Sequence, residues 1–235
     1  ILMLLLCCAV APLAAFAKTT ITSPGSEVTA DILQEKIQQA DASQSLDDAS
    51  KAMLLELYRK SLSFLSQRQS YEEVAREFMR LRESAPAQAR ELRAQLGRLE
   101  ALPAPLLPAT LAQAPLDQLE QQFLGEKATL LDLRAALDEA VASLEGQSQR
   151  AQQVRERLQQ ARNRQTEIAQ LIKLPEAGEQ SAEIAEARLW SLQLEKLALS
   201  AEIEMLNQEL LSQPMRVELY GAQRDKAALV LDRQQ

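Results

Sequence analysis

The stretch Ser181–Gln235, which begins SAEIAEARLWSLQLEKLALSAEIEMLNQELLSQ, decides the fold. Steps of three and four residues link fourteen positions from Ala185 to Leu231, and eleven of these are apolar. This spacing is typical of one stripe along an α-helix, with the 3.5-residue repeat of a coiled coil. A second apolar row lies beside it: Trp190, Leu194, Leu197 and Ala201. Because so wide an apolar face exceeds what one partner covers, we expect two neighbouring helices.

Two upstream stretches repeat this pattern. Residues 47–102 keep one register, and it continues unchanged across Pro86. Residues 116–174 carry seventeen stripe positions, fourteen of them apolar, that run from Leu116 through Phe123 to Ile172. A proline inside a helix removes a backbone hydrogen bond and costs about 3 kcal/mol. Since the phase does not change, Pro86 and Pro214 predict kinks and not helix ends.

Two connectors separate the three stretches. Residues 103–115 contain four prolines, a density that no helix tolerates, and residues 175–180 form a short break that reverses the chain. The predicted helices, about 47–102, 116–174 and 181–235, are nearly equal in length. We therefore predict an all-α fold over 47–235: an elongated, up-down-up antiparallel coiled coil, or three-helix bundle, with proline kinks.

The N-terminal part of the chain has a different character. Residues 1–17 read ILMLLLCCAVAPLAAFA, without charge, and end in a small-x-small motif, which predicts a secretory signal peptide. A membrane anchor is the alternative, although the run is shorter than the ~20 residues of a spanning helix. A lipid on Cys7 or Cys8 is another. Residues 18–46 are a lead-in with one short helix, for which Ser26 is the expected cap, and Ser45 is expected to start the next helix.

Composition excludes several kinds of function. The net charge of −7 gives no reason to expect a nucleic acid partner, because phosphate binding needs a concentrated positive surface. The chain has no histidine, and its two cysteines lie in the signal-like segment, so the rest offers no imidazole base, thiol nucleophile or soft metal ligand. We predict no catalytic, cofactor-binding or metal-binding residues and no enzyme activity.

Several single residues stand out within the stripes. Trp190 is the only tryptophan, and its place in the second row predicts interhelix packing. Arginines occur at three stripe positions, where we expect them to snorkel or to set the register: Arg68, Arg82 and Arg224. A local run of arginines is expected to be a solvated helix face, with a lipid-headgroup or cell-wall contact as the alternative: Arg150, Arg155, Arg157, Arg162 and Arg164.

The chain also resembles a known family. The resemblance begins at Glu186-Ala187-Arg188-Leu189-Trp190 and continues through EIEMLNQELLSQPMRVELYGAQRDKAAL, residues 202–229. Earlier parts that share it are FMRLRESAPAQARELRAQLGRLEAL, residues 78–102, and PLDQLEQQFLGEKATLLDLRAALDEAVASL, residues 115–144. These segments are similar to the periplasmic N-terminal region, the MscS porin domain, of large MscS-type mechanosensitive channels of the potassium-regulated KefA/MscK kind.

This resemblance implies the periplasmic coiled-coil ectodomain of an inner-membrane channel, with a structural or regulatory part in tension-gated ion efflux and osmotic protection. The implied partners are the subunits of the same channel, as a homo-oligomer formed through a membrane part absent from this sequence, with cell-envelope components as a second class. The alternative is a freestanding periplasmic adaptor or scaffold of envelope proteins. Because the sequence starts with Ile and its last stripe is still in phase at Leu231, we expect a piece of a longer membrane protein.

Overall fold

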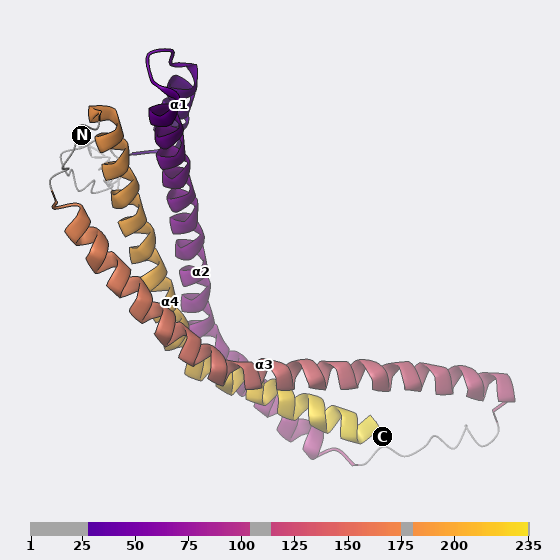
Figure 1. The fold of residues 1–235 in the computed structure, drawn as a ribbon. Coiled ribbons are helices and arrows are strands. Elements are labelled where there is room, and N and C mark those ends of the chain that lie inside the picture. The colour runs from indigo at the N-terminus through magenta and orange to yellow at the C-terminus, as the bar shows by residue number, and fades with distance from the viewer. Residues whose placement is uncertain (1–27, 104–113, 175–180, 235) are drawn as a thin grey trace, which may run out of the picture.

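A computed structural model describes residues 28–103, 114–174 and 181–234, which form four helices (Figure 1). A short helix, α1 (Ala30–Ala42), precedes three long ones: α2 (Asp48–Glu100), α3 (Leu116–Leu171) and α4 (Ala182–Gln234). The long helices have 53, 56 and 53 residues, and the predicted ranges run close to these bounds. The prediction of an all-α fold is confirmed. The signal-like residues 1–17 and most of both predicted connectors lie outside the described residues.

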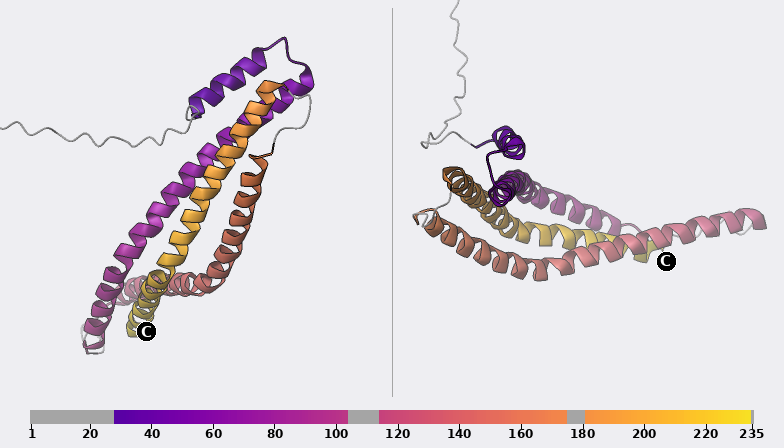
Figure 2. Two further views of the ribbon diagram at one scale, coloured as in Figure 1. Left: turned by 90° about the vertical axis from the view of Figure 1, so that its left-hand side faces the viewer. Right: turned by 45° about the horizontal axis from the view of Figure 1, so that its top comes forward.

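Helix α4 is the centre of the assembly, with α2 on one side and α3 on the other (Figure 2). The α2–α4 contacts rise together along both helices, from Arg82–Gln208 to Arg93–Glu218, so these helices are parallel. Along α3 and α4 the contacts run in opposite senses, from Arg150–Glu209 to Arg164–Glu195, so these are antiparallel. The up-down-up order and the two neighbours expected for the last helix are therefore both observed.

Helix α1 covers one end of the α2–α4 pair. Leu33 and Ala40 of α1 are buried against Leu54 and Tyr58 of α2 and against a group on α4: Ile184, Ala187 and Leu194. Side-chain caps stabilise the N-termini of α1 and α2. In each, a side-chain oxygen of the cap residue accepts a hydrogen bond from a backbone N–H that has no partner within the first turn. The Ile32 N–H donates to the Thr29 hydroxyl at 3.4 Å, and the Ser50 N–H donates to Asp47 Oδ1 at 2.8 Å.

The residues that cap the N-termini of α1 and α2 are Thr29 and Asp47. The helix predicted to start at Ser45 is instead capped by Asp47, two residues later. The physical reason is that the Asp47 carboxylate accepts from both the backbone N–H and the hydroxyl of Ser50, whereas Ser45 pairs with Ser43 outside the helix. Thr29 caps α1, and Ser26, the predicted cap, lies outside the described residues.

Both internal prolines lie inside continuous helices, as predicted: Pro86 in α2 and Pro214 in α4. Figure 1 shows that α2, α3 and α4 change direction together about halfway along the bundle. Helix α3 takes part in this bend although it contains no proline. Proline alone therefore does not account for the shape of the bundle.

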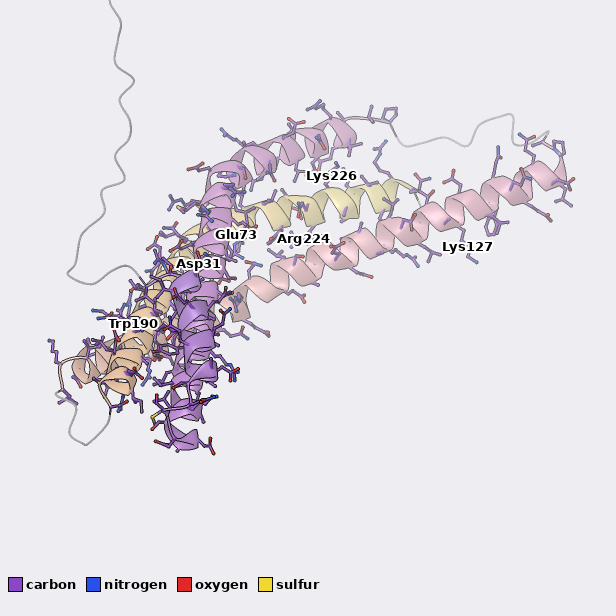
Figure 3. All side chains as sticks on the ribbon, turned by 90° about the horizontal axis from the view of Figure 1, so that it is seen from above. Asp31, Glu73, Lys127, Trp190, Arg224 and Lys226 are labelled. Carbon is purple, nitrogen blue, oxygen red and sulfur yellow. The ribbon has the colours of Figure 1, made fainter. Side chains whose placement is uncertain are left out.

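The long helices are staggered, a feature that the periodicity of the sequence does not predict. The predicted stripe of α3 includes Leu116 and Phe123, yet these side chains are 69% and 67% exposed. The reason is the α3–α4 register, which brings Gln234, the last described residue of α4, beside Glu126. Residues 116–125 of α3 extend past that point, and Figure 3 shows Lys127 close to where α3 leaves the other helices. The buried positions of the predicted stripe of α3 therefore begin only at Ala140.

Candidate functional site on the central helix

Twelve of the fourteen buried positions of α4 form a line that we call the α4 seam. Its members recur every three or four residues: Ile184, Ala187, Ser191, Leu194, Ala198, Glu202, Met205, Glu209, Ser212, Arg216, Leu219 and Ala222. Five of the twelve are polar or charged. By contrast, the predicted stripe includes Leu189 and Val217, which are partly exposed. The seam lies between the two apolar rows of the sequence and shares Leu194 with the second row.

Three arginine–glutamate pairs join α3 to α4 along this seam, and we call them the charge ladder. Arg150 donates from Nε to Glu209 Oε1 at 2.6 Å and from Nη2 to Oε2 at 2.9 Å. Arg157 binds Glu202 in the same two-bonded way, at 2.5 and 2.9 Å. Arg164 does so with Glu195, at 2.8 and 3.2 Å. Successive rungs are seven residues apart on both helices, which is the heptad repeat of antiparallel coiled coils.

Burial is distributed unequally within the ladder. The side chains of Glu209 and Glu202 are 4% and 6% exposed, whereas those of Arg150 and Arg157 are about half exposed. A carboxylate removed from water is costly unless it is paired and hydrogen-bonded. The planar guanidinium supplies two parallel bonds and keeps part of its own surface in water. Each buried glutamate therefore requires its arginine, and this requirement fixes the α3–α4 register.

The pKa values of the arginines reflect the same arrangement. The pKa of each guanidinium in the ladder is raised above its ordinary value, chiefly because each donates hydrogen bonds to its glutamate. Partial burial acts in the opposite direction and is the smaller effect. The three arginines accordingly carry their positive charge throughout the physiological pH range.

Arg216 is a different kind of buried cation. Its Nη2 donates to the backbone carbonyl of Glu209 at 3.1 Å, and its guanidinium lies 5.1 Å from the centre of the Phe78 ring on α2. The carboxylate of Glu209 is 4.0 Å away. Burial lowers the pKa of Arg216, and Glu209 partly opposes this change. Arg216 thus connects the α4 seam to α2, as the ladder connects it to α3.

The arginine run is exposed, as predicted for a solvated helix face. The structure adds that three of its members, Arg150, Arg157 and Arg164, also bind glutamates of α4. The sequence feature that could have predicted the ladder is the heptad spacing of these three arginines. It matches the spacing of Glu195, Glu202 and Glu209, but only the hairpin register shows which glutamates they meet.

The other predicted positions divide between interhelix and local contacts. Arg82 sets register, because its Nη1 donates to Gln208 on α4 at 3.3 Å. Arg68 and Arg224 pair with acids on their own helices, Glu72 and Asp225. Trp190 packs between helices as predicted: its ring centre is 6.3 Å from that of Tyr58, and the Lys36 ammonium of α1 is 6.0 Å from it. Figure 3 shows Trp190 at the end of the bundle where α1 lies.

The described residues offer little for chemistry on a ligand. Within 28–103, 114–174 and 181–234, no group of three or more His, Cys, Asp or Glu side chains is placed to hold a metal ion. A groove of about 770 Å³ lies between α3 and α4 and touches Leu92 of α2, with an apolar lining that includes Leu133, Ala140, Tyr220 and Val230. Across the same ranges, each helix falls short of the continuous apolar length that a membrane span requires.

Comparison with known proteins gives one assignment. The family model described as "Mechanosensitive ion channel porin domain" matches residues 36–235, which includes the end of α1 and all three long helices. No curated protein and no solved structure matches the chain. The family match covers most of the sequence and agrees with the resemblance found in residues 78–102, 115–144 and 202–229. The chain belongs to the MscS porin family, the porin domain of mechanosensitive ion channels.

Proposed function

We propose that this chain is the periplasmic helical ectodomain of a mechanosensitive ion channel, a structural and regulatory part of tension-gated ion efflux in osmotic protection. The observation that carries the proposal is the family match over residues 36–235, which makes the chain part of a mechanosensitive channel. Membership of the potassium-regulated KefA/MscK group remains a prediction.

The structure supports a mechanical role through the charge ladder. If α3 slid along α4 by one residue, Glu202 and Glu209 would lose the arginines that neutralise them while remaining between helices. The two-bonded geometry also restricts rotation of one helix against the other. A body in which neighbouring helices resist sliding transmits a displacement from one end to the other. This is the behaviour required of a spacer or lever attached to a channel.

Location and partners follow from the same proposal. Residues 1–17 direct export, so that the helices stand in the periplasm and the channel lies in the inner membrane. The direct partners are further subunits of the same channel, in a homo-oligomer held together by its membrane part. Cell-envelope components are the second class of partner, through the exposed faces of the helices.

The first test is to read the gene beyond codon 235. The proposal predicts further coding sequence that contains several runs of ~20 apolar residues, each long enough to cross a membrane, followed by a channel domain. A stop codon directly after codon 235 would contradict it and would favour the freestanding periplasmic adaptor.

The second test is electrical. The full-length product is expressed in a bacterium without its own mechanosensitive channels, and tension-gated currents are recorded from membrane patches in potassium and in sodium solutions. We expect currents that open under suction. The Glu202→Gln/Glu209→Gln variant, which weakens two rungs of the ladder, should open at a different tension. The matched control, Glu72→Gln, removes only an exposed pair within α2 and should leave the threshold unchanged. Equal thresholds in all three proteins would contradict a role of the ladder in gating.

A further inference from the structure

Each of the three long helices contains, in its interior, a residue that weakens a helix: Pro86 in α2, Gly146 in α3 and Pro214 in α4. Proline removes a backbone hydrogen bond, and glycine costs about 1 kcal/mol in a helix relative to alanine. Their positions in the sequence are 60 or more residues apart. Whether they act together depends on whether the fold brings them to the same level.

The α2–α4 contacts place the two prolines at one level. Arg82 meets Gln208, and further along the parallel pair Arg93 meets Glu218. Pro86 lies between these contacts on α2, and Pro214 lies between them on α4. The packing around them agrees, since Ala85 and Ala89 share one buried cluster with Leu219, Ala222 and Met215.

The α3–α4 contacts bring Gly146 to the same level. Gln213, which precedes Pro214, donates from Nε2 to the backbone carbonyl of Gln147 at 3.3 Å, and Gln147 follows Gly146. The nearest rung of the charge ladder, Arg150–Glu209, lies about one turn away. All three weak points therefore fall within about one helical turn of one another, and Figure 1 shows the bundle bending in this region.

The backbone and side chains at this level are incompletely satisfied. Pro214 leaves the Leu210 carbonyl without its usual intrahelical donor. The carbonyl of Glu209 accepts two side-chain bonds, one from the Ser212 hydroxyl and one from Arg216. Arg216 Nε and Gln147 Oε1 are the two buried side-chain atoms in the described ranges that lack a hydrogen-bond partner. Unsatisfied buried polar atoms are costly, so this level is held less firmly than the packed segments on either side.

Gly146 has no packing reason to be glycine. A Cβ added there would meet no atom within 4 Å, and the same holds for Gly125 in the exposed half of α3. Gly146 therefore affects the bundle only by making α3 easier to bend at this point. A single weak point in a packed bundle is held straight by its neighbours, whereas three weak points at one level allow the helices to bend together.

From this coincidence we propose that Pro86, Gly146 and Pro214 form a hinge, at which the two halves of the bundle change their relative direction as units. The inference rests on contacts and helix chemistry alone, so it stands whether or not the channel assignment is correct. In a channel ectodomain, such a hinge would convert a displacement at one end into a change of angle.

The test measures distances across the hinge between spin labels on α3. Labels are attached at Gln121→Cys and Arg162→Cys, both exposed, in the full chain carrying Cys7→Ser and Cys8→Ser. The 41 residues between them would span ~62 Å in a straight helix. We expect a broad distribution centred below that value. In the Pro86→Ala/Gly146→Ala/Pro214→Ala variant it should narrow and move toward ~62 Å.

Two controls make the result specific. A pair on one side of the hinge, Gln121→Cys with Asp138→Cys, should give the same narrow distance in both backgrounds. Gly125→Ala changes a matched glycine away from the hinge and should leave the distance distribution between positions 121 and 162 unchanged. Gly146→Ala alone should narrow that distribution. Should the triple variant fail to fold by circular dichroism, this glycine pair decides the question. The proposal would be overturned if the distance distribution between positions 121 and 162 were already narrow and if neither the triple variant nor Gly146→Ala changed it.

Discussion

The two halves of α3 carry the same periodic pattern but lie in different surroundings. In residues 140–171, buried positions recur along one face: Ala140, Ala151, Val154, Leu158, Ala161 and Ile168. In residues 116–139, no side chain is fully buried, although the stripe there contains larger residues such as Phe123 and Leu130. The half with the more hydrophobic stripe is thus the more exposed one.

This difference shows what periodicity measures and what it does not. A stripe at heptad spacing indicates which face of a helix is suited to a partner. It does not indicate how far along the helix that partner reaches. In this bundle α4 reaches Glu126 of α3, but fully buried side chains and all three rungs of the charge ladder lie only in the second half of α3. Small residues such as Ala151 and Ala161 pack there because α4 comes close.

The largest expected effect contrasts one residue from each half. Ile168→Ala should destabilise the domain by about 2–5 kcal/mol, because it leaves a cavity at a fully buried position. Phe123→Ala removes a larger side chain from an exposed site and should change stability by less than about 0.5 kcal/mol. Urea unfolding followed by circular dichroism measures both. Comparable losses would mean that the first half of α3 is packed in solution.

The next effect concerns the ladder. Arg157→Ala leaves the nearly buried Glu202 without a partner and should cost roughly 1–3 kcal/mol, a range that allows for the half-exposed arginine. Adding Glu202→Ala should recover part of this loss, which a double-mutant cycle quantifies. The matched exposed pair on α2, Arg68 and Glu72, should show a coupling of only about 0–1 kcal/mol. Equal coupling in the two cycles would show that burial of Glu202 contributes nothing.

A smaller effect tests how the exposed half of α3 is held. Helix α3 has little tertiary support at Gly125, so its helicity there depends on intrinsic propensity. Gly125→Ala should stabilise this segment by about 1 kcal/mol, seen as slower amide exchange in residues 116–139. The thermal midpoint of the domain should change little, because the packed half is unaffected. A large rise in that midpoint would indicate that the two halves unfold together.

The smallest effect depends on pH and concerns a helix end. Hydrogen bonds from the backbone and side chain of Ser50 lower the pKa of Asp47 below its ordinary 3.8. A lowered pKa means that the ionised cap contributes stability above 3.8, and that this contribution is lost as the pH falls through the folded-state pKa. Asp47→Asn should retain the cap and lose its pH dependence. Identical acid titrations of the two proteins by circular dichroism would contradict this.

Much of the fold could be predicted because it depends on local patterns. The phase of the stripe across Pro86 and Pro214 showed that both helices continue. Two apolar rows on the last helix, with Trp190 and Leu194 in the second, showed that it needs two neighbours. These features follow from residue spacing alone, and this spacing can be read within each helical stretch without knowledge of its partners.

The candidate site could be predicted only in part, because it depends on which residues of two helices meet. Glu202 and Glu209 lie between apolar rows and look like surface residues in the sequence. Both glutamates are buried because α4 lies between α2 and α3. The fold accommodates their buried charges because Arg157 and Arg150, about 50 residues away in the sequence, bind them. The stagger of α3 was missed for the same reason: nearly equal helix lengths do not determine the register.

The central claim is that α4 is the shared partner of α2 and α3 and that it packs closely against α3 only along the second half of α3, residues 140–171. Amide hydrogen exchange of the full chain, resolved along α3, tests this most directly. We predict strong protection from Ala140 to Leu171, where α4 and the ladder hold the helix, and fast exchange from Leu116 to Glu139, where local opening costs little. Uniform protection along the whole of α3 would contradict the claim.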